Sequence, residues 1–407
     1  MKKSVIVGQS GGPTAVINAS LYGVVREALK QEDSFDKVYG MINGIEGFLN
    51  GQIMDMKPLE KSGELELIRT TPGSYLGSCR YKLPEELDDP VYGKLFERFE
   101  EYGIGCFFYI GGNDSMDTVS KLSRWAKKNG SDIRFIGVPK TIDNDLVNTD
   151  HTPGYGSAAK YVATTVREIG VDASVYDNKK SVTIVEIMGR HAGWLTAAGV
   201  LARKFEGDNP VLIYLPETAF DPERFIKDVE SALEKTSNLV VCISEGINDG
   251  KGTFICELAS DVGVDTFGHK MLTGSGKYLE NLVKERLGVK VRSIELNVSQ
   301  RCSSSMLSAV DLTEAAESGA YGVRAALAGE TGKMVAFRRR EGREYSLEYV
   351  TEDVDLICNK EKTVPLEWIT GDGSDIGQEF IDYALPLIQG EVEVPSENGL
   401  PLFAYRR

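Results

Sequence analysis

The stretch PKTIDNDL, residues 139–146, places a lysine, a threonine and two aspartates directly after the apolar run IRFIGV. The carboxylates of Asp143 and Asp145 lie close in sequence to the ammonium group of Lys140. A carboxylate beside a cation stays ionised and can accept a proton. The stretch therefore predicts either a general base with a positive charge next to it or a salt-bridged turn.

Two glycine-rich loops contain the residue types of an anion site. Gly11 and Gly12 lie between an apolar run and a helical pattern, where backbone amides can approach an anion. A tight turn without a ligand is the alternative. In the second loop, YIGGNDS, oxygens of Asn113 and Asp114 could hold Mg²⁺, although helix capping also explains Asp114. Neither loop has the glycine fingerprint of a nicotinamide dehydrogenase or the P-loop pattern.

A methionine beside an arginine in EIMGRHAG, residues 186–193, suits a ligand with an apolar face and an anionic end, such as a sugar phosphate. Arginine side chains match phosphate oxygens with two parallel hydrogen bonds. Taken singly, each of the other candidate arginines is better explained as a surface charge. These are Arg80, Arg292 and Arg301.

The elements that must position these loops are short apolar runs alternating with amphipathic ones. The expected buried strands are residues 4–8, 106–110, 133–138, 181–187, 210–215 and 239–245. The expected helices are residues 15–29, 115–128, 157–169, 193–204, 222–235 and 277–287. Residues 333–350 are expected to form a hairpin. The alternation predicts an α/β fold with parallel sheets, in which the loops after the strands converge on one crevice.

Length and composition narrow the class of protein further. A chain of 407 residues suits two domains, and without a visible linker these are expected to exchange segments. The net charge of −15 argues against nucleic-acid binding, and no apolar run approaches the ~18 residues of a membrane span. Six cysteines without a C-x-x-C pair predict free thiols and a cytoplasmic location. Three histidines without H-x-x-x-H spacing argue against a zinc site.

Taken together, the loops resemble the phosphofructokinase A family over roughly residues 3–335. The matching stretches are, in order, SGGPTAVIN, GSYLGSCRY, IGGNDS, PKTIDND, TPGYGSA, VEIMGR, ISEG and R-x8-R. The resemblance implies two Rossmann-like three-layer α/β domains with mainly parallel sheets. The larger would comprise residues 1–153 with about 306–352 and hold the phosphoryl donor. The smaller would comprise 154–305 with about 353–407 and hold fructose 6-phosphate.

The resemblance also implies roles for individual residues. Asp143 would accept the proton of the sugar 1-hydroxyl, and Thr141 would contact the transferred phosphoryl group. Residues expected to hold fructose 6-phosphate are Met188, Gly189, Arg190, Glu245, Arg292 and Arg301. Residues expected to hold the donor are Gly11, Gly12 and Arg80. A homodimer or homotetramer that uses Mg²⁺ is implied as well.

Two departures from the family pattern concern the donor. ATP-using members typically have glycine where this chain has Asp114 and Lys140, and those glycines leave space for the α-phosphate. The pair therefore resembles the pyrophosphate-dependent branch, in which the lysine still neutralises a terminal phosphate and the carboxylate repels ATP. An ATP-dependent enzyme with a divergent pocket is the first alternative. A non-catalytic sugar-phosphate sensor is the second, and the Thr141-x-Asp143 pattern argues against it.

Three further departures concern the metal and the sugar. Asn113 replaces the aspartate that binds Mg²⁺ in the ATP enzymes, so the metal would rest on Asn113 through water, on Asp114 or on the donor's oxygens. Ser181 replaces an arginine that the family often supplies from a neighbouring subunit, which leaves Lys179 or Lys180 as the candidate contact to the 6-phosphate. Val298 replaces the family's usual histidine or tyrosine.

Overall fold

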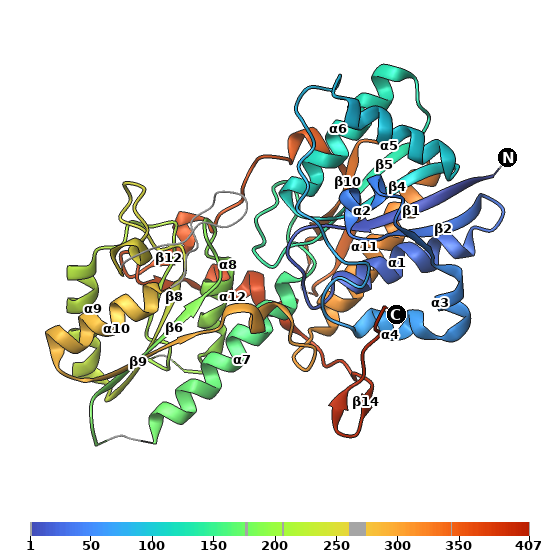
Figure 1. Cartoon of the computed structure of the whole chain (residues 1–407). Coiled ribbons are helices and arrows are strands. Elements are labelled where there is room, and N and C mark those ends of the chain that lie inside the picture. The colour runs from blue at the N-terminus through green and yellow to red at the C-terminus, as the bar shows by residue number, and fades with distance from the viewer. Residues whose placement is uncertain (1, 176–177, 206, 260–273, 343, 407) are drawn as a thin grey trace. The chain divides into compact units, whose positions relative to one another are not determined.

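The computed structural model describes residues 2–175, 178–205, 207–259, 274–342 and 344–406 (Figure 1). They form two compact units, each assembled from segments that are far apart in the sequence. Unit 1 comprises Met1–Ser157, Arg301–Lys360 and Gln389–Arg407, and unit 2 comprises Ala158–Gln300 and Glu361–Ile388. No described helix is both long enough and apolar enough to cross a membrane.

The described part of unit 1 is built on a seven-stranded sheet with the order β11-β10-β5-β4-β1-β2-β3. The five inner strands run parallel, and the two edge strands, β3 and β11, are antiparallel to their neighbours. The strands are β1 (Lys3–Gln9), β2 (Phe35–Met41), β3 (Ile53–Asp55), β4 (Ile104–Gly111), β5 (Arg134–Pro139), β10 (Lys333–Arg339) and β11 (Leu347–Asp353).

Helices cover both faces of this sheet, because successive side chains of its strands alternate between two cores. Val5 and Val7 belong to the core that α1 and α11 cover, whereas Ile6 belongs to the core that α2, α5 and α6 cover. The helices of unit 1 are α1 (Ile17–Lys30), α2 (Gly44–Leu49), α3 (Lys57–Ser62), α4 (Glu64–Thr70), α5 (Pro90–Glu101), α6 (Asn113–Asn129), α11 (Ala309–Leu327) and the 3-10 turn η4 (Val354–Leu356).

Unit 2 has a parallel four-stranded sheet with the order β7-β8-β6-β9. Helices α9 and α10 pack on one face, and the turn after α8 lies against Cys242 on the other. Its strands are β6 (Ser181–Ile187), β7 (Leu212–Tyr214), β8 (Asn238–Ser244) and β9 (Lys290–Glu295). Its helical segments are α7 (Tyr155–Ser174), α8 (Trp194–Ala197), η1 (Ala198–Ala202), α9 (Pro222–Lys235), η2 (Ile255–Ala259), α10 (Ser275–Leu287), η3 (Asn297–Arg301), η5 (Leu366–Trp368), α12 (Gln378–Ala384) and η6 (Leu385–Ile388).

The secondary structure departs from the sequence prediction at several positions, and the strand expected over residues 210–215 is limited to β7, Leu212–Tyr214. The helix expected over residues 193–204 is one α-helical turn, α8, followed by the 3-10 turn η1. Gly199 lies there so close to β8 that a Cβ atom would be 3.1 Å from the sulfur of Cys242. The sequence prediction does not include β2, α5, β9 or α11. In α11, Gly319 and Gly322 weaken the helical pattern.

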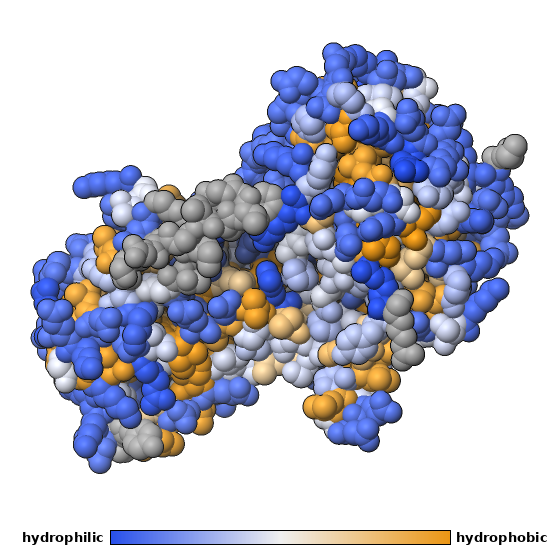
Figure 2. Space-filling model, viewed as in Figure 1, coloured by the Kyte–Doolittle hydropathy of each residue, from blue (hydrophilic) through white to orange (hydrophobic). Residues whose placement is uncertain are grey.

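The C-terminal segment also differs from expectation, since residues 389–407 belong to unit 1 rather than unit 2. Ala404 is buried and its amide donates to Oγ1 of Thr71 over 3.0 Å. The guanidinium group of Arg406 donates to the carbonyl of Leu76 over 2.6 Å. Just before Ala404 in the chain, the small hairpin of β14 (Ser396–Glu397) and β15 (Leu400–Pro401) exposes hydrophobic surface (Figure 2).

Candidate active site

The Gly11–Gly12 turn follows β1 in unit 1 and lies against two cations. Gly11 has a φ of +76°, a conformation that favours glycine. A Cβ atom there would be 3.4 Å from Nζ of Lys140, and one at Gly12 would be 3.4 Å from Nη1 of Arg301. The structure therefore brings together two glycines and two cations that lie far apart in the sequence, with Arg301 on the side of the expected donor site.

Lys140 is buried, with 4% of its surface exposed, and its ammonium group donates to the carbonyl of Gly12 over 2.6 Å. Burial lowers the pKa of Lys140 to about 8. The carboxylates of Asp143 and Asp145 act in the opposite direction, whereas the charges of Arg301 and Arg80 lower the pKa further. A desolvated ammonium group whose own carboxylate neighbours do not offset its burial is stabilised by an anionic ligand.

The loop after β5 holds Thr141 and Asp143 face to face. Oγ1 of Thr141 lies 3.4 Å from Oδ2 of Asp143 and accepts a hydrogen bond of 3.1 Å from its amide. Thr141 is buried, whereas Asp143 is half-buried. A hydroxyl and a carboxylate beside a desolvated ammonium group can orient an alcohol and accept its proton.

Asn113 and Asp114 begin α6, and the structure gives them different surroundings. Oδ1 of Asn113 accepts from the amide of Asn359 over 2.8 Å, and its Nδ2 donates to the carbonyl of Lys360 over 2.6 Å. Asn113 therefore holds the 359–360 backbone, which competes with the predicted role as a metal ligand. Asp114 is exposed, and its carboxylate makes no hydrogen bond or ion pair with the described residues, Lys140 included.

A buried network of hydrogen bonds, which the sequence does not predict, connects the Gly11–Gly12 turn to the loop that carries Arg80. The side chain of Gln9 donates to Oδ1 of Asn18 over 2.8 Å and accepts from the amide of Leu76 over 2.9 Å. Oγ of Ser78 donates to the carbonyl of Gly11 over 2.7 Å. Arg80 itself is exposed at the end of this braced loop. A buried Gln and Asn beside a glycine turn were the only signal in the sequence.

In unit 2, the ends of β6 and β8 bring the Met188–Arg190 loop and Glu245 together. The amide of Gly189 lies 3.4 Å from Oε1 of Glu245, whose own amide donates to the carbonyl of Ile187 over 2.8 Å. Gly189 has a φ of +143°, and a Cβ atom there would be 2.6 Å from the carbonyl oxygen of Ala192. The backbone at this position therefore requires glycine.

Arg292 does not join this loop within unit 2. It lies on the edge strand β9, in register with Thr183 of β6, so it sits well before the carboxyl end of the sheet. It is exposed and lines a cavity of about 60 Å³ together with Lys179, Ser181 and Lys290. The cations considered for the 6-phosphate thus form a second group, apart from Met188–Arg190 and Glu245.

Comparison with known proteins bears on both groups of residues. The Phosphofructokinase family model matches residues 4–326. The chain belongs to the phosphofructokinase family. All the candidate site residues lie within the residues that this family model matches. The C-terminal part of the chain lies beyond them, including helix α12 of unit 2 and Arg406, which contacts unit 1.

Individual family members resemble the chain over nearly its whole length. The pyrophosphate–fructose 6-phosphate 1-phosphotransferase of Halomonas elongata is 40% identical over 97% of this chain and 94% of its own length. The protein of the same name from Methylococcus capsulatus is 39% identical over 98% of this chain and 94% of its own. The crystal structure of a pyrophosphate-dependent phosphofructokinase from Marinobacter aquaeolei covers 98% of this chain and 95% of its own, with 38% identity and a TM-score of 0.89. Both units therefore have the phosphofructokinase fold, as the sequence predicted.

Proposed function

We propose that this protein transfers a phosphoryl group reversibly between pyrophosphate and the 1-hydroxyl of fructose 6-phosphate. The observation that carries the proposal is the buried ammonium group of Lys140 at the Gly11–Gly12 turn. It supplies positive charge close to the turn, and the family resemblance implies that ATP-using members have glycine at this position and leave its space to the α-phosphate. The names of the relatives from Halomonas elongata and Methylococcus capsulatus support the same donor and acceptor.

The chemistry follows from the positions of three side chains. The 1-hydroxyl oxygen of the sugar attacks the transferred phosphorus while the bond to the leaving phosphate breaks. Asp143 takes the hydroxyl proton, and Thr141 donates a hydrogen bond to the phosphoryl group. Lys140 and Arg301 neutralise the donor's oxygens, which is the main contribution that proteins make to phosphoryl transfer.

Mg²⁺ fits this proposal as an ion held jointly by the donor and the protein. No cluster of three or more His, Cys, Asp or Glu side chains among the described residues forms a ready-made metal cage. Proteins usually bind Mg²⁺ through one or two carboxylates together with phosphate oxygens. Asp114 provides an exposed carboxylate that none of the described side chains pairs with, whereas the amide of Asn113 is engaged by residues 359–360. Bound Mg²⁺ would supply further neutralisation of phosphate charge.

The sugar site would use Met188, Gly189, Arg190 and Glu245 of one subunit. The separate group of Lys179, Ser181 and Arg292 then suits a contact to the 6-phosphate of a neighbouring subunit, in a homodimer or homotetramer. Light scattering of the purified protein would detect this assembly. An active monomer would contradict it and leave Arg292 without a role at the sugar.

The decisive experiment measures fructose 1,6-bisphosphate formed from fructose 6-phosphate and Mg²⁺ with either pyrophosphate or ATP. We expect turnover with pyrophosphate to exceed that with ATP by at least about tenfold, ~1.4 kcal/mol in the transition state. A preference for ATP would refute the donor while leaving the family intact. Binding of fructose 6-phosphate without turnover on either donor would support a sensor instead.

A further inference from the structure

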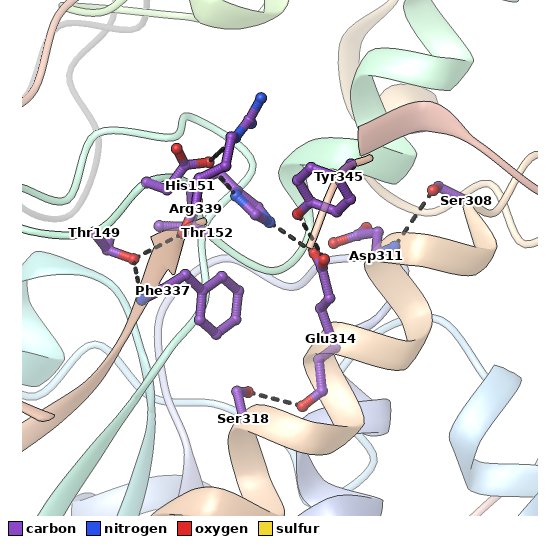
Figure 3. A network of polar contacts seen from close by, with 12 residues as sticks. Thr149, His151, Thr152, Ser308, Asp311, Glu314, Ser318, Phe337, Arg339 and Tyr345 are labelled. Carbon is purple, nitrogen blue, oxygen red and sulfur yellow. Dashed lines mark hydrogen bonds and ion pairs between the residues drawn. The ribbon is translucent and has the colours of Figure 1, made fainter. Parts of the chain in front are cut away.

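Figure 3 shows a cluster of polar and charged side chains around His151 and Glu314, and Thr152, next to His151, bonds the backbone of Thr141. His151 is 1% exposed and is flanked by carboxylates on both sides. Its Nδ1 lies 2.8 Å from Oδ1 of Asp150, and its Nε2 lies 2.7 Å from Oε2 of Glu314 on α11. Each ring nitrogen faces an acceptor, and both can donate only when the imidazole is protonated. The geometry therefore holds an imidazolium between two carboxylates.

Side chains from two further elements complete the cluster. Nη2 of Arg339 on β10 lies 2.9 Å from Oδ1 of Asp150, and the hydroxyl of Tyr345 donates to Oε1 of Glu314 over 2.6 Å. Burial acts against the charge of His151, but Glu314 and Asp150 outweigh it and raise the pKa of His151 to about 9. The other titratable groups that face Glu314 are Asp311 on α11 and Tyr349 on β11.

The residues that follow His151 hold the backbone of Thr141. Oγ1 of Thr152 donates to the carbonyl of Thr141 over 2.8 Å, and the amide of Thr141 donates to the carbonyl of Pro153 over 3.2 Å. Thr141 also forms a parallel bridge with Gly154. Both backbone groups of Thr141 are therefore fixed by the two residues next to His151.

The same segment is attached to the body of unit 1 on either side of this contact. The amide of Asp150 donates to the carbonyl of Phe337 over 2.8 Å, and the amide of Phe337 donates to Oγ1 of Thr149 over 2.9 Å. Oδ1 of Asp311 accepts from the amide of Gly154 over 2.9 Å. Between these attachments, the charged pairs of His151 connect the segment to α11.

We infer that His151 is a positioning residue, whose clamp by Asp150 and Glu314 presses residues 151–153 against Thr141 and so aims Thr141 and Asp143. The inference rests on the proposed function, because that function assigns the reacting groups to Thr141 and Asp143. His151 would act through the backbone of Thr141 and would not itself contact a substrate.

The first test replaces His151→Gln and compares it with Ser318→Ala. Ser318 lies one turn from Glu314 on α11, but within the part of the chain that the structure describes its hydroxyl bonds only to the carbonyl of Ala315 in the same helix. We expect His151→Gln to raise hydrogen exchange about tenfold in the peptide of residues 140–146 and to lower kcat by about 10- to 100-fold, the scale of small misplacements in a site. KM for pyrophosphate should stay within about twofold. Ser318→Ala should change neither quantity.

A second pair of variants keeps the charged cluster and cuts only its connection to Thr141. Thr152→Val removes the hydroxyl that bonds the Thr141 carbonyl, whereas Thr152→Ser retains it. We expect the valine variant to reproduce the loss of kcat and of exchange protection, and the serine variant to recover most of both. Unchanged exchange of residues 140–146 in Thr152→Val and His151→Gln would overturn the inference. If the wild-type protein does not use pyrophosphate, the proposed function fails. The hydrogen-exchange measurement still decides whether the clamp around His151 holds residues 140–146.

The pH dependence of stability gives an independent readout. The folded pKa of His151 lies above its unfolded value, so its stabilising effect is complete below about pH 6.5 and is lost as the pH rises through about 9. The Tm of the wild-type protein should therefore fall toward that of His151→Gln across this window. A constant difference in Tm would show that the imidazolium is not the clamping species.

Discussion

The two groups of candidate site residues differ in how far their charges are removed from water. In unit 1, Lys140 is 4% exposed and donates to the carbonyl of Gly12 beside Arg301. In unit 2, Arg190 and Glu245 are half-buried and Arg292 is exposed. Electrostatic interactions strengthen as water is excluded, whereas solvated charges contribute little each. Substitution of the desolvated Lys140 should therefore affect the reaction strongly, whereas substitution of the more solvated charges in unit 2 should mainly affect sugar binding.

The largest effect is expected for Asp143→Asn. The amide keeps the size of the side chain but cannot accept the hydroxyl proton, so kcat should fall by about 10²–10⁴. KM for fructose 6-phosphate should change little. Asp145→Asn, two residues further along the same loop, is the matched control and should cost far less. Equal losses in both variants would show that the loop needs its charge rather than a base at Asp143.

The next effect is expected for Lys140→Met, which keeps an unbranched side chain without its charge. Truncating a desolvated charge contact costs about 2–5 kcal/mol, so kcat/KM for pyrophosphate should fall by about 10²-fold or more. Steady-state rates at varied pyrophosphate measure the loss. Retention of kcat/KM within a few-fold would mean that Lys140 only fastens the Gly12 carbonyl and does not face the donor.

The fall of kcat/KM for pyrophosphate at alkaline pH should report the loss of the charge on Lys140. Burial lowers the pKa of Lys140 to about 8, so the free enzyme loses its ammonium charge as the pH rises through that value. kcat/KM for pyrophosphate should fall above about pH 8, because this parameter reports groups of the free enzyme. Lys140→Met should lack this part of the fall. Ionisation of pyrophosphate affects both proteins alike, so the difference between their profiles isolates Lys140.

A smaller effect, specific to the donor, is expected for Asp114→Gly. Removing an exposed carboxylate at the start of α6 relieves repulsion of a third phosphate and should raise the use of ATP relative to pyrophosphate by about tenfold. The two values of kcat/KM, measured at matched Mg²⁺, give the ratio. The control is Glu97→Gly, which removes an exposed carboxylate from α5. Asp117 on α6 is unsuitable as a control, because it forms a buried ion pair with Lys121. An unchanged ratio would separate Asp114 from donor choice.

The smallest effect is expected for Arg292→Ala. An exposed arginine on an edge strand contributes one solvated phosphate contact, so KM for fructose 6-phosphate should rise roughly five- to tenfold, ~1 kcal/mol, with kcat nearly unchanged. A loss of kcat/KM as large as that of Lys140→Met, about 10²-fold, would contradict the distinction between desolvated and solvated charges.

The sequence predicts those features that depend on neighbouring residues. Strand β6 and helix α9 have the expected bounds, because one is a continuous apolar run and the other starts with the Asp221 cap and Pro222. Helix α11 could not be found this way. Its Gly319 allows contact with α1, where a Cβ atom would lie 2.2 Å from the carbonyl oxygen of Ser20, so its glycines reflect a partner almost 300 residues away.

The same limit applies to the site. The lysine, threonine and aspartate of residues 140–143 are visible as a cluster because they are adjacent in the chain. The acceptor for Lys140, the carbonyl of Gly12, is 128 residues distant and depends on the order of strands in the sheet. Asn113 was assigned to a metal from its neighbours alone, whereas its partners, Asn359 and Lys360, come from the other end of the chain.

The anchoring of Ala404 and Arg406 onto Thr71 and Leu76 has a consequence for synthesis on the ribosome. Domains usually fold in order as they emerge, with the N-terminal one first. Here unit 1 includes residues 301–360 and 389–407, so its sheet lacks β10 and β11 until residue 353 has been translated, and its 71–80 loop lacks the contacts of Ala404 and Arg406 until residue 406 has been translated. The apolar faces of β1, β4 and β5 therefore wait for β10 and β11 during most of synthesis, and a chain truncated shortly before residue 404 would lose two hydrogen bonds to the 71–80 loop while keeping those that Gln9 and Ser78 make.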